Sequence, residues 1–155
     1  DAITLHPRSR AQMFEGKANW SKLAELKSVL KIPVIGSGDL FSADDVVRMF
    51  GETGCDAVMV ARGAMGNPWL FREALALMAG ETPVPPTVAE RLAVARRHLE
   101  LFTEFEGGRV ALMEMRKHLA WYSKGLPGAA HFRAAVNRIE HTAELVGAME
   151  EFFDG

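Results

Sequence analysis

The chain has 155 residues, of which 48% are hydrophobic and 25% charged, a balance typical of a globular protein with one or two domains. No apolar run approaches the roughly 20 residues that a membrane-spanning helix needs, which argues against a membrane role. Lysine and arginine number 18 against 20 aspartate and glutamate, so the net charge of −2 gives no overall attraction to nucleic acid. Any contact with RNA has to come from a local basic patch.

The chain has one cysteine, Cys55, which excludes an internal disulfide framework and a cysteine-rich zinc site. We predict no metal site. Cys55 precedes the third predicted strand, at the edge opposite the predicted site, so we expect it to be buried and unreactive. The sequence opens on the strand-like run Asp1–His6, without a signal segment. We therefore expect a cytoplasmic protein, and a chain that begins within its fold.

The first half alternates between strand and helix patterns. Short apolar runs predict strands over 2–6, 33–36 and 56–61, and periodic apolar residues predict helices over 21–31, 42–52 and 68–79. Ser42, with Asp45 three residues later, predicts the N-cap of the second helix. We expect Trp69 and Phe71 to pack in the interior. Strands that alternate with helices pair in parallel, so residues 1–80 are predicted to form the last three βα units of a (β/α)₈ TIM barrel, too few to close it.

The second half has a different character. Residues 81–87 contain three prolines and predict an extended linker. Thr87 and Glu90 then form a capping-box pattern. From 88 to 155 apolar residues recur at helical spacing, ending with Leu145, Met149 and Phe152, which predicts a bundle of about four helices.

Glycines and charged residues follow two consecutive predicted strands. The second strand ends in the run Gly36-Ser37-Gly38-Asp39, and the third ends in Ala61-Arg62-Gly63. Carboxyl ends of parallel strands meet at one edge, and glycines let backbone N–H groups approach an anion. Arg62 can add a charge-assisted contact. The pattern therefore predicts a phosphate-binding site, to which Ser37, Gly38, Asp39, Ala61 and Arg62 contribute.

Other polar side chains of the first half are candidates for the same edge. His6 ends the first strand there, where ligands of barrel enzymes bind. Asp39 either orients its loop or meets a ligand, and we expect it to be available because Ser42 is the better helix cap. Arg8 and Arg10 are candidates for contacts to phosphate or RNA; the alternative is that one of them pairs with Glu15 or Asp39.

Four basic residues of the second half recur at spacings that place them within about a third of a helix circumference. They are Arg109, Arg116, Lys117 and Lys124. This set is a candidate RNA-contacting face, and the alternative is an ordinary solvated helix face.

Together these residues resemble a known family along essentially the whole chain. The sequence is similar to the C-terminal half of bacterial tRNA-dihydrouridine synthases, which reduce specific uridines in tRNA. The resemblance rests on an ordered series of motifs: His6-Pro7-Arg8-Ser9-Arg10, Gly16-Lys17-Ala18 with Trp20, Pro33-Val34-Ile35 to Gly38-Asp39, Thr53 to Met59, Arg62-Gly63-Ala64, Gly66 to Phe71, Arg116-Lys117-His118 with Trp121-Tyr122, and Phe132-Arg133 with Asn137.

The resemblance implies an FMN-binding barrel followed by a helical tRNA-binding domain, with NADPH as the reductant. It places His6, the Ser37-Gly38-Asp39 loop and the Ala61-Arg62 pair at the phosphate and ribityl end of FMN. The family usually has Asn at position 37 and Gly at position 61. Its catalytic cysteine lies in the other half of the barrel, so we assign no catalytic residue here and expect this segment alone to be inactive. We expect a monomer for the full-length protein.

Two other functions share parts of this pattern. A phosphate-anchoring flavin oxidoreductase that acts on a free pyrimidine would share the strand-end glycines and Arg62, but would not need the helical half. A non-catalytic RNA-binding module would rely on the helices alone, and would bind tRNA without flavin.

Overall fold

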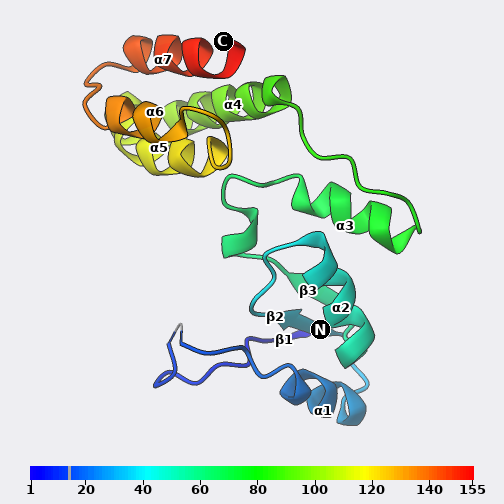
Figure 1. Ribbon diagram of the computed structural model, residues 1–155. Coiled ribbons are helices and arrows are strands. Elements are labelled where there is room, and N and C mark those ends of the chain that lie inside the picture. Colours follow the sequence, from blue (N-terminus) through cyan, green and yellow to red (C-terminus); the bar gives the residue numbers. More distant parts are fainter. Residues whose placement is uncertain (14) are drawn as a thin grey trace. The chain divides into compact units, whose positions relative to one another are not determined.

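The computed structural model describes residues 1–13 and 15–155. These residues form two compact units, Asp1–Val84 and Pro85–Gly155, which are described separately below (Figure 1). The division falls inside the proline-rich segment 81–87.

The first unit contains a strand-helix alternation in the predicted order. Its elements are β1 (Ile3–Leu5), α1 (Ser21–Val29), β2 (Val34–Ser37), α2 (Ala43–Thr53), β3 (Ala57–Met59), a short 3₁₀ turn (Arg62–Ala64) and α3 (Leu70–Met78). Strands β1 and β3 are shorter than predicted, β2 has the predicted length but lies one residue later, and the 3₁₀ turn was not expected from the sequence.

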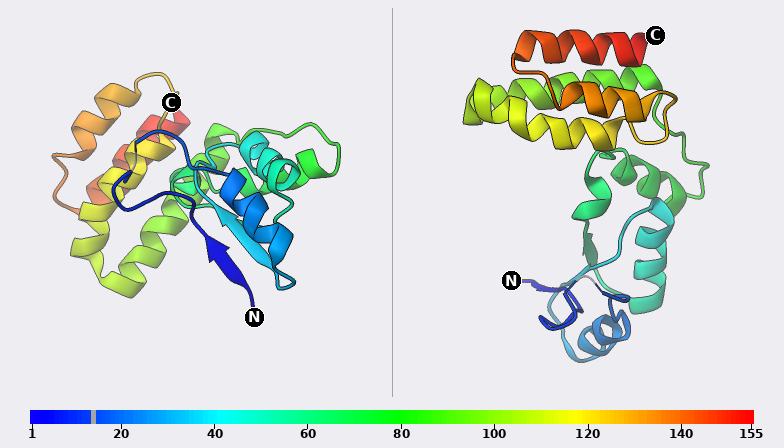
Figure 2. Two further views of the ribbon diagram at one scale, coloured as in Figure 1. Left: turned by 90° about the horizontal axis from the view of Figure 1, so that it is seen from below. Right: turned by 60° about the vertical axis from the view of Figure 1, so that its left-hand side comes forward.

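The described strands form one parallel sheet in the order β1-β2-β3. Leu5 lies opposite Gly36, and Gly36 lies opposite Val58, so the strands run side by side with their carboxyl ends at one edge. The predicted parallel pairing is confirmed. Helices α1 and α2 pack against one face of β2, and α3 packs against α2 (Figure 2).

The core of the first unit lies between the sheet and its helices. Leu23, Val34, Met49 and Leu70 are fully buried there. A Cβ on Gly36 would lie 2.7 Å from Met49 Sδ and 3.2 Å from Cys55 Sγ. Gly36 is therefore required for helix–sheet packing, and not for the approach of a ligand as its place in the glycine run had indicated. Cys55 is buried, as predicted.

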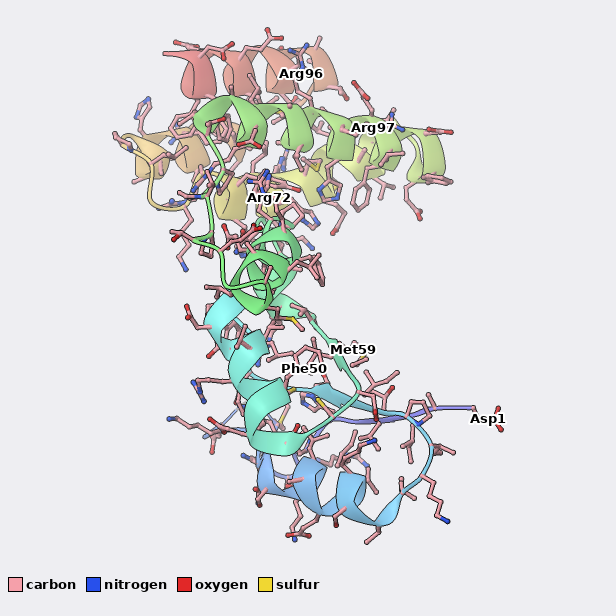
Figure 3. The ribbon with its side chains drawn as sticks, turned by 90° about the vertical axis from the view of Figure 1, so that its right-hand side faces the viewer. Asp1, Phe50, Met59, Arg72, Arg96 and Arg97 are labelled. Carbon is pink, nitrogen blue, oxygen red and sulfur yellow. The ribbon has the colours of Figure 1, made fainter. Side chains whose placement is uncertain are left out.

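Helix α2 begins as predicted, because Ser42 accepts a hydrogen bond from Asp45 N–H and Asp45 caps in return. The expectation for α3 is correct in part. Trp69 is buried, but Phe71 is 50% exposed. Phe71 shares the outer face of α3 with exposed Leu75 and Met78, so that face carries no core residue. Figure 3 labels one residue on each of three elements of this unit: Phe50 on α2, Met59 on β3 and Arg72 on α3.

The second unit is helical throughout. It consists of α4 (Val88–Glu106), α5 (Gly108–Tyr122), α6 (Ala129–Val136) and α7 (Thr142–Asp154). The predicted capping box at the start of α4 is present, with Thr87 accepting from Glu90 N–H and Glu90 accepting from Thr87 N–H. Helix α7 lies alongside α4 and also contacts α5 and α6 (Figure 1).

Apolar side chains from all four helices meet in the centre of the second unit. Met115, Leu119, Leu145 and Met149 are fully buried. The predicted inward position of Phe152 is wrong by one residue: Phe153 is buried, whereas Phe152 is half-buried and stacks on the ring of Phe132, with centroids 4.1 Å apart.

Ion pairing also joins helices of the second unit: Arg96 Nη2 lies 2.9 Å from Glu150 Oε1, linking α4 to α7. Among the described residues, none of the helices is both long and apolar enough to cross a membrane.

Candidate phosphate-binding site

The residues predicted for a phosphate site come together at the carboxyl edge of the sheet. They line one small cavity of about 30 Å³, which Leu40, Phe41, Met59 and Gly63 complete. This is the volume of a small polar recess at the sheet edge. The predicted residues at this cavity are His6, Ser37, Gly38, Asp39, Ala61 and Arg62.

The loops after β2 and β3 are in direct backbone contact beside this cavity. A Cβ on Gly63 would lie only 2.0 Å from the backbone oxygen of Leu40. Only glycine allows this approach, because any side chain would separate the two loops. Gly63 therefore brings Arg62 against the loop of Gly38 and Asp39.

His6 and Ser37 form one wall of the cavity. His6 Nδ1 lies 3.3 Å from Ser37 Oγ, within hydrogen-bond distance, and Ser37 is only 3% exposed. His6 itself is exposed. A Cβ on Gly38 would lie 3.3 Å from His6 Cε1 and 2.9 Å from the Cβ of Ala18. Gly38 thus fits only without a side chain, and it leaves its backbone close to the imidazole.

Arg62 is the exposed cation of the site. Its side chain is 41% exposed, its Nη2 lies 3.7 Å from Asp39 Oδ1, and its guanidinium lies over the ring of Phe41 at 5.1 Å from the centroid. These contacts hold the guanidinium beside the cavity, where its charge can meet an anion.

Asp39 differs from the expectation that it stays available for a ligand. Its Oδ2 accepts hydrogen bonds from Ala18 N–H at 2.7 Å and from Arg8 Nη2 at 2.9 Å. Its backbone is left-handed, with φ of +56°, directly after Gly38 with φ of +108°. The carboxylate is therefore engaged with the loop that follows β1.

Arg8 and Arg10 have different surroundings. The Arg8 side chain is 4% exposed and also donates to the Gly16 backbone oxygen at 2.8 Å. This supports the alternative of a pair with Asp39. Arg10 is exposed, in agreement with either of its interpretations.

The basic residues of the second unit do not form one exposed face. Arg109, Lys117 and Lys124 are exposed, but Arg116 is half-buried and donates from Nη2 to the backbone oxygen of Ile139. Arg116 links α5 to the segment before α7, and contact of any of the four residues with RNA stays a prediction. Lys117 pairs with Glu114 one turn away at 2.6 Å. Lys124 lies beyond the end of α5, and not on that helix.

An aromatic cluster that was not predicted from the sequence lies between α4 and α5. His98 and His118 lie edge to face with ring centroids 4.4 Å apart, and His98 Nδ1 lies 3.2 Å from the Tyr122 hydroxyl. Trp121 packs on His118 at 5.1 Å. Burial lowers the pKa of His98, and burial followed by the neighbouring His98 lowers the pKa of His118. The helical spacing of His118, Trp121 and Tyr122 was the available signal.

The described residues hold no cluster of three or more histidine, cysteine or carboxylate side chains that would suit a metal ion. The polar groups at the sheet edge are glycine backbone, the His6 imidazole, the Asp39 carboxylate and the Arg62 guanidinium, and the backbone N–H groups and the guanidinium can contact an anion.

Comparison with known proteins identifies the family of the chain. The family model described as "Dihydrouridine synthase (Dus)" matches residues 1–154. The chain belongs to the dihydrouridine synthase family. The resemblance noted from the sequence motifs is thereby confirmed, and the sheet-edge cavity lies within the matched region of this dihydrouridine synthase family member.

Curated relatives of the dihydrouridine synthase family give the same result. The chain is 44% identical over 143 residues to "Probable tRNA-dihydrouridine synthase 1" of Synechocystis, covering 92% of this chain and 40% of the relative. It is 40% identical over 146 residues to a "Probable tRNA-dihydrouridine synthase" of Mycobacterium leprae, covering 93% and 38%. It is 38% identical over 154 residues to "tRNA-dihydrouridine synthase B" of Xanthomonas axonopodis pv. citri, covering 99% and 46%. The chain thus spans less than half the length of these relatives.

Proposed function

We propose that the chain is part of a tRNA-dihydrouridine synthase, which reduces uridine to 5,6-dihydrouridine in tRNA with FMN as cofactor and NADPH as reductant. Residues 1–80 supply the last three βα units of its TIM barrel. Residues 81–87 link them to a helical bundle, 88–155, that contacts tRNA. The protein acts in the cytoplasm as a monomer.

One observation carries this proposal. In a chain that belongs to the dihydrouridine synthase family, the residues at the ends of three neighbouring strands line the same cavity. The residues fit the phosphate end of FMN. Arg62 offers a charge-assisted contact, Gly38 brings backbone close to the ligand, and His6 with Ser37 offers polar atoms on the opposite wall. The cavity is small, about 30 Å³, which is consistent with a site for the phosphate end alone.

In this assignment the protein and the cofactor have separate tasks. The flavin, when bound, supplies hydride chemistry for the pyrimidine ring. The first unit binds the flavin phosphate, and the second unit binds tRNA. The target uridine must leave its base stack to reach the mouth of the barrel. No catalytic residue is assigned within this chain.

The experiment uses the full-length protein expressed from the complete reading frame. With FMN, NADPH and unmodified tRNA, we expect dihydrouridine to form and NADPH to be consumed. Arg62→Ala should weaken FMN binding by about tenfold or more, because a charge-assisted phosphate contact is lost. Lys31→Ala, an exposed charge change in the same unit, is the matched control and should retain FMN.

Either of two results would contradict the proposal. One is a well-folded full-length protein that forms no dihydrouridine in any unmodified tRNA. The other is an Arg62→Ala variant that purifies with the same FMN occupancy as the wild type.

A further inference from the structure

The loop after β1 and the loop after β2 are joined through one carboxylate. Asp39 accepts hydrogen bonds from the Arg8 guanidinium at 2.9 Å and from Ala18 N–H at 2.7 Å. Beside it, Trp20 Nε1 donates to the Gly38 backbone oxygen at 3.0 Å. Residues about twenty to thirty positions earlier in the chain therefore hold the backbone of Gly38 and Asp39, which we call the phosphate loop.

The phosphate loop needs such support because its backbone is unfavourable by itself. Gly38 and Asp39 have consecutive positive φ angles of +108° and +56°. The left-handed region is unfavourable for a residue with a side chain, although less so for aspartate than for bulkier residues. Contacts from outside the loop must offset this cost, and the Asp39 carboxylate supplies them.

We propose that Arg8 and Asp39 form a clasp that holds the Gly38–Asp39 loop in its phosphate-binding conformation, so that both are positioning residues and contact neither RNA nor flavin. This rests on the proposed function, since it specifies how the flavin-phosphate site is built.

The charges at the site support this assignment. A carboxylate beside a phosphate repels it unless a cation balances the carboxylate. Asp39 has two guanidinium neighbours, Arg8 at 2.9 Å and Arg62 at 3.7 Å, which leaves one positive charge in excess. Arg8 makes the closer ion pair with Asp39, so the carboxylate that borders the cavity is balanced from the loop after β1.

The burial of Arg8 supports it as well. Its side chain is 4% exposed, and within the described residues its Nε and Nη1 are buried without a hydrogen-bond partner. Among the described residues, the contacts of Nη2 with Asp39 and Gly16 therefore fix this guanidinium. Removing one member of such a pair leaves the other as an uncompensated buried charge.

The test measures flavin binding by apo-protein prepared from the full-length protein. Dissociation constants for FMN and for riboflavin, which lacks the phosphate, are determined by fluorescence titration for Asp39→Asn, Arg8→Met and the double variant. Asp44→Asn and Lys31→Met, both exposed in the same unit, are matched controls.

The clasp predicts that each single variant weakens FMN about tenfold and riboflavin far less. The double variant should lose no more than either single variant, because the two residues act as one unit. Asp39→Asn is the sharpest case. Removing a negative charge near a phosphate would strengthen binding by simple electrostatics, whereas loss of the clasp weakens it.

Several results would overturn the clasp. They are unchanged or tighter FMN binding by Asp39→Asn, an equal loss for FMN and riboflavin, or an Arg8→Met variant with a reduced salt dependence of tRNA binding. If Arg8→Met does not fold, Asp39→Asn, which keeps the shape of the side chain, decides the outcome.

The failure of the proposed function can be told apart from the failure of the clasp. Wild-type apo-protein that binds no FMN would overturn both. Wild-type protein that binds FMN, together with an Asp39→Asn variant that binds it equally well, overturns the clasp alone.

Discussion

Two glycines of the first unit show how differently one residue type is used. Gly63 lies where a Cβ would meet the Leu40 backbone oxygen at 2.0 Å, whereas a Cβ on Gly51 in α2 would meet nothing within 4 Å. The first is required by the approach of two loops, and the second is an ordinary helix residue with a low helix propensity.

We predict opposite effects for the two alanine substitutions. Gly63→Ala should destabilise the full-length protein by about 2 kcal/mol, because the loops must separate, and should weaken FMN binding. Gly51→Ala should stabilise it by up to about 1 kcal/mol and leave FMN binding unchanged. Denaturant unfolding and flavin titration of both variants test this, and equal stabilities would contradict it.

Residue types at strand ends were predictable from sequence, but their partners were not. The glycine and arginine pattern correctly marked the sheet edge because strand periodicity and parallel pairing are local rules. The pairing of Arg8 with Asp39 spans 31 positions and was only one of two open interpretations. Likewise nothing in the run Gly36-Ser37-Gly38 shows that Gly36 packs on Met49 while Gly38 borders the cavity.

At the scale of elements, the pair of α4 and α5 contains two partly buried histidines whose pKa values are lowered. His98 and His118 face each other across these helices, with Lys117 and Glu114 beside His118. Burial lowers the pKa of both imidazoles below the ordinary 6.5, so the folded state binds protons more weakly than the unfolded state.

We therefore predict that stability is unaffected by these histidines above pH 6.5 and falls as the pH drops below it. The double variant His98→Gln/His118→Gln should show a flatter dependence of the free energy of unfolding between pH 7 and pH 5, a window that begins just above the ordinary pKa of 6.5 and extends below it. Exposed His131→Gln is the control and should keep the wild-type slope. An unchanged slope in the double variant would contradict the prediction.

Element boundaries followed the sequence where a cap marks them. The capping boxes at Ser42 and Thr87 fix the starts of α2 and α4 as expected. The 3₁₀ turn Arg62–Ala64 has no such signal, since it arises from the contact of two loops. The role of Arg116, which reaches the Ile139 backbone oxygen, also depends on the packing of helices that periodicity does not specify.

At the scale of the molecule, the proposed function divides two ligands between two units. The salt dependence of tRNA binding measures how many phosphates the protein neutralises. Arg109 and Lys117 are exposed on α5, whereas Arg116 is held by a backbone carbonyl.

In the full-length protein, Arg109→Ala and Lys117→Ala should each weaken tRNA binding and reduce the salt slope by about one. Arg116→Ala should instead lower the stability of the helical unit, with a smaller change in slope. FMN affinity should be unaffected in all three. A slope that changes only in Arg116→Ala would reverse this assignment and restore Arg116 as the phosphate contact.

Strand β2 has a consequence for any attempt to select variants of this site. Val34 and Gly36 face the helices, whereas Ser37 faces the cavity, so positions that serve the core and positions that serve the ligand alternate within four residues. A mutant library across this strand screened for flavin colour alone would lose colour at both kinds of position for unrelated reasons. Selection here has to sort first for folded protein, and only then for bound ligand.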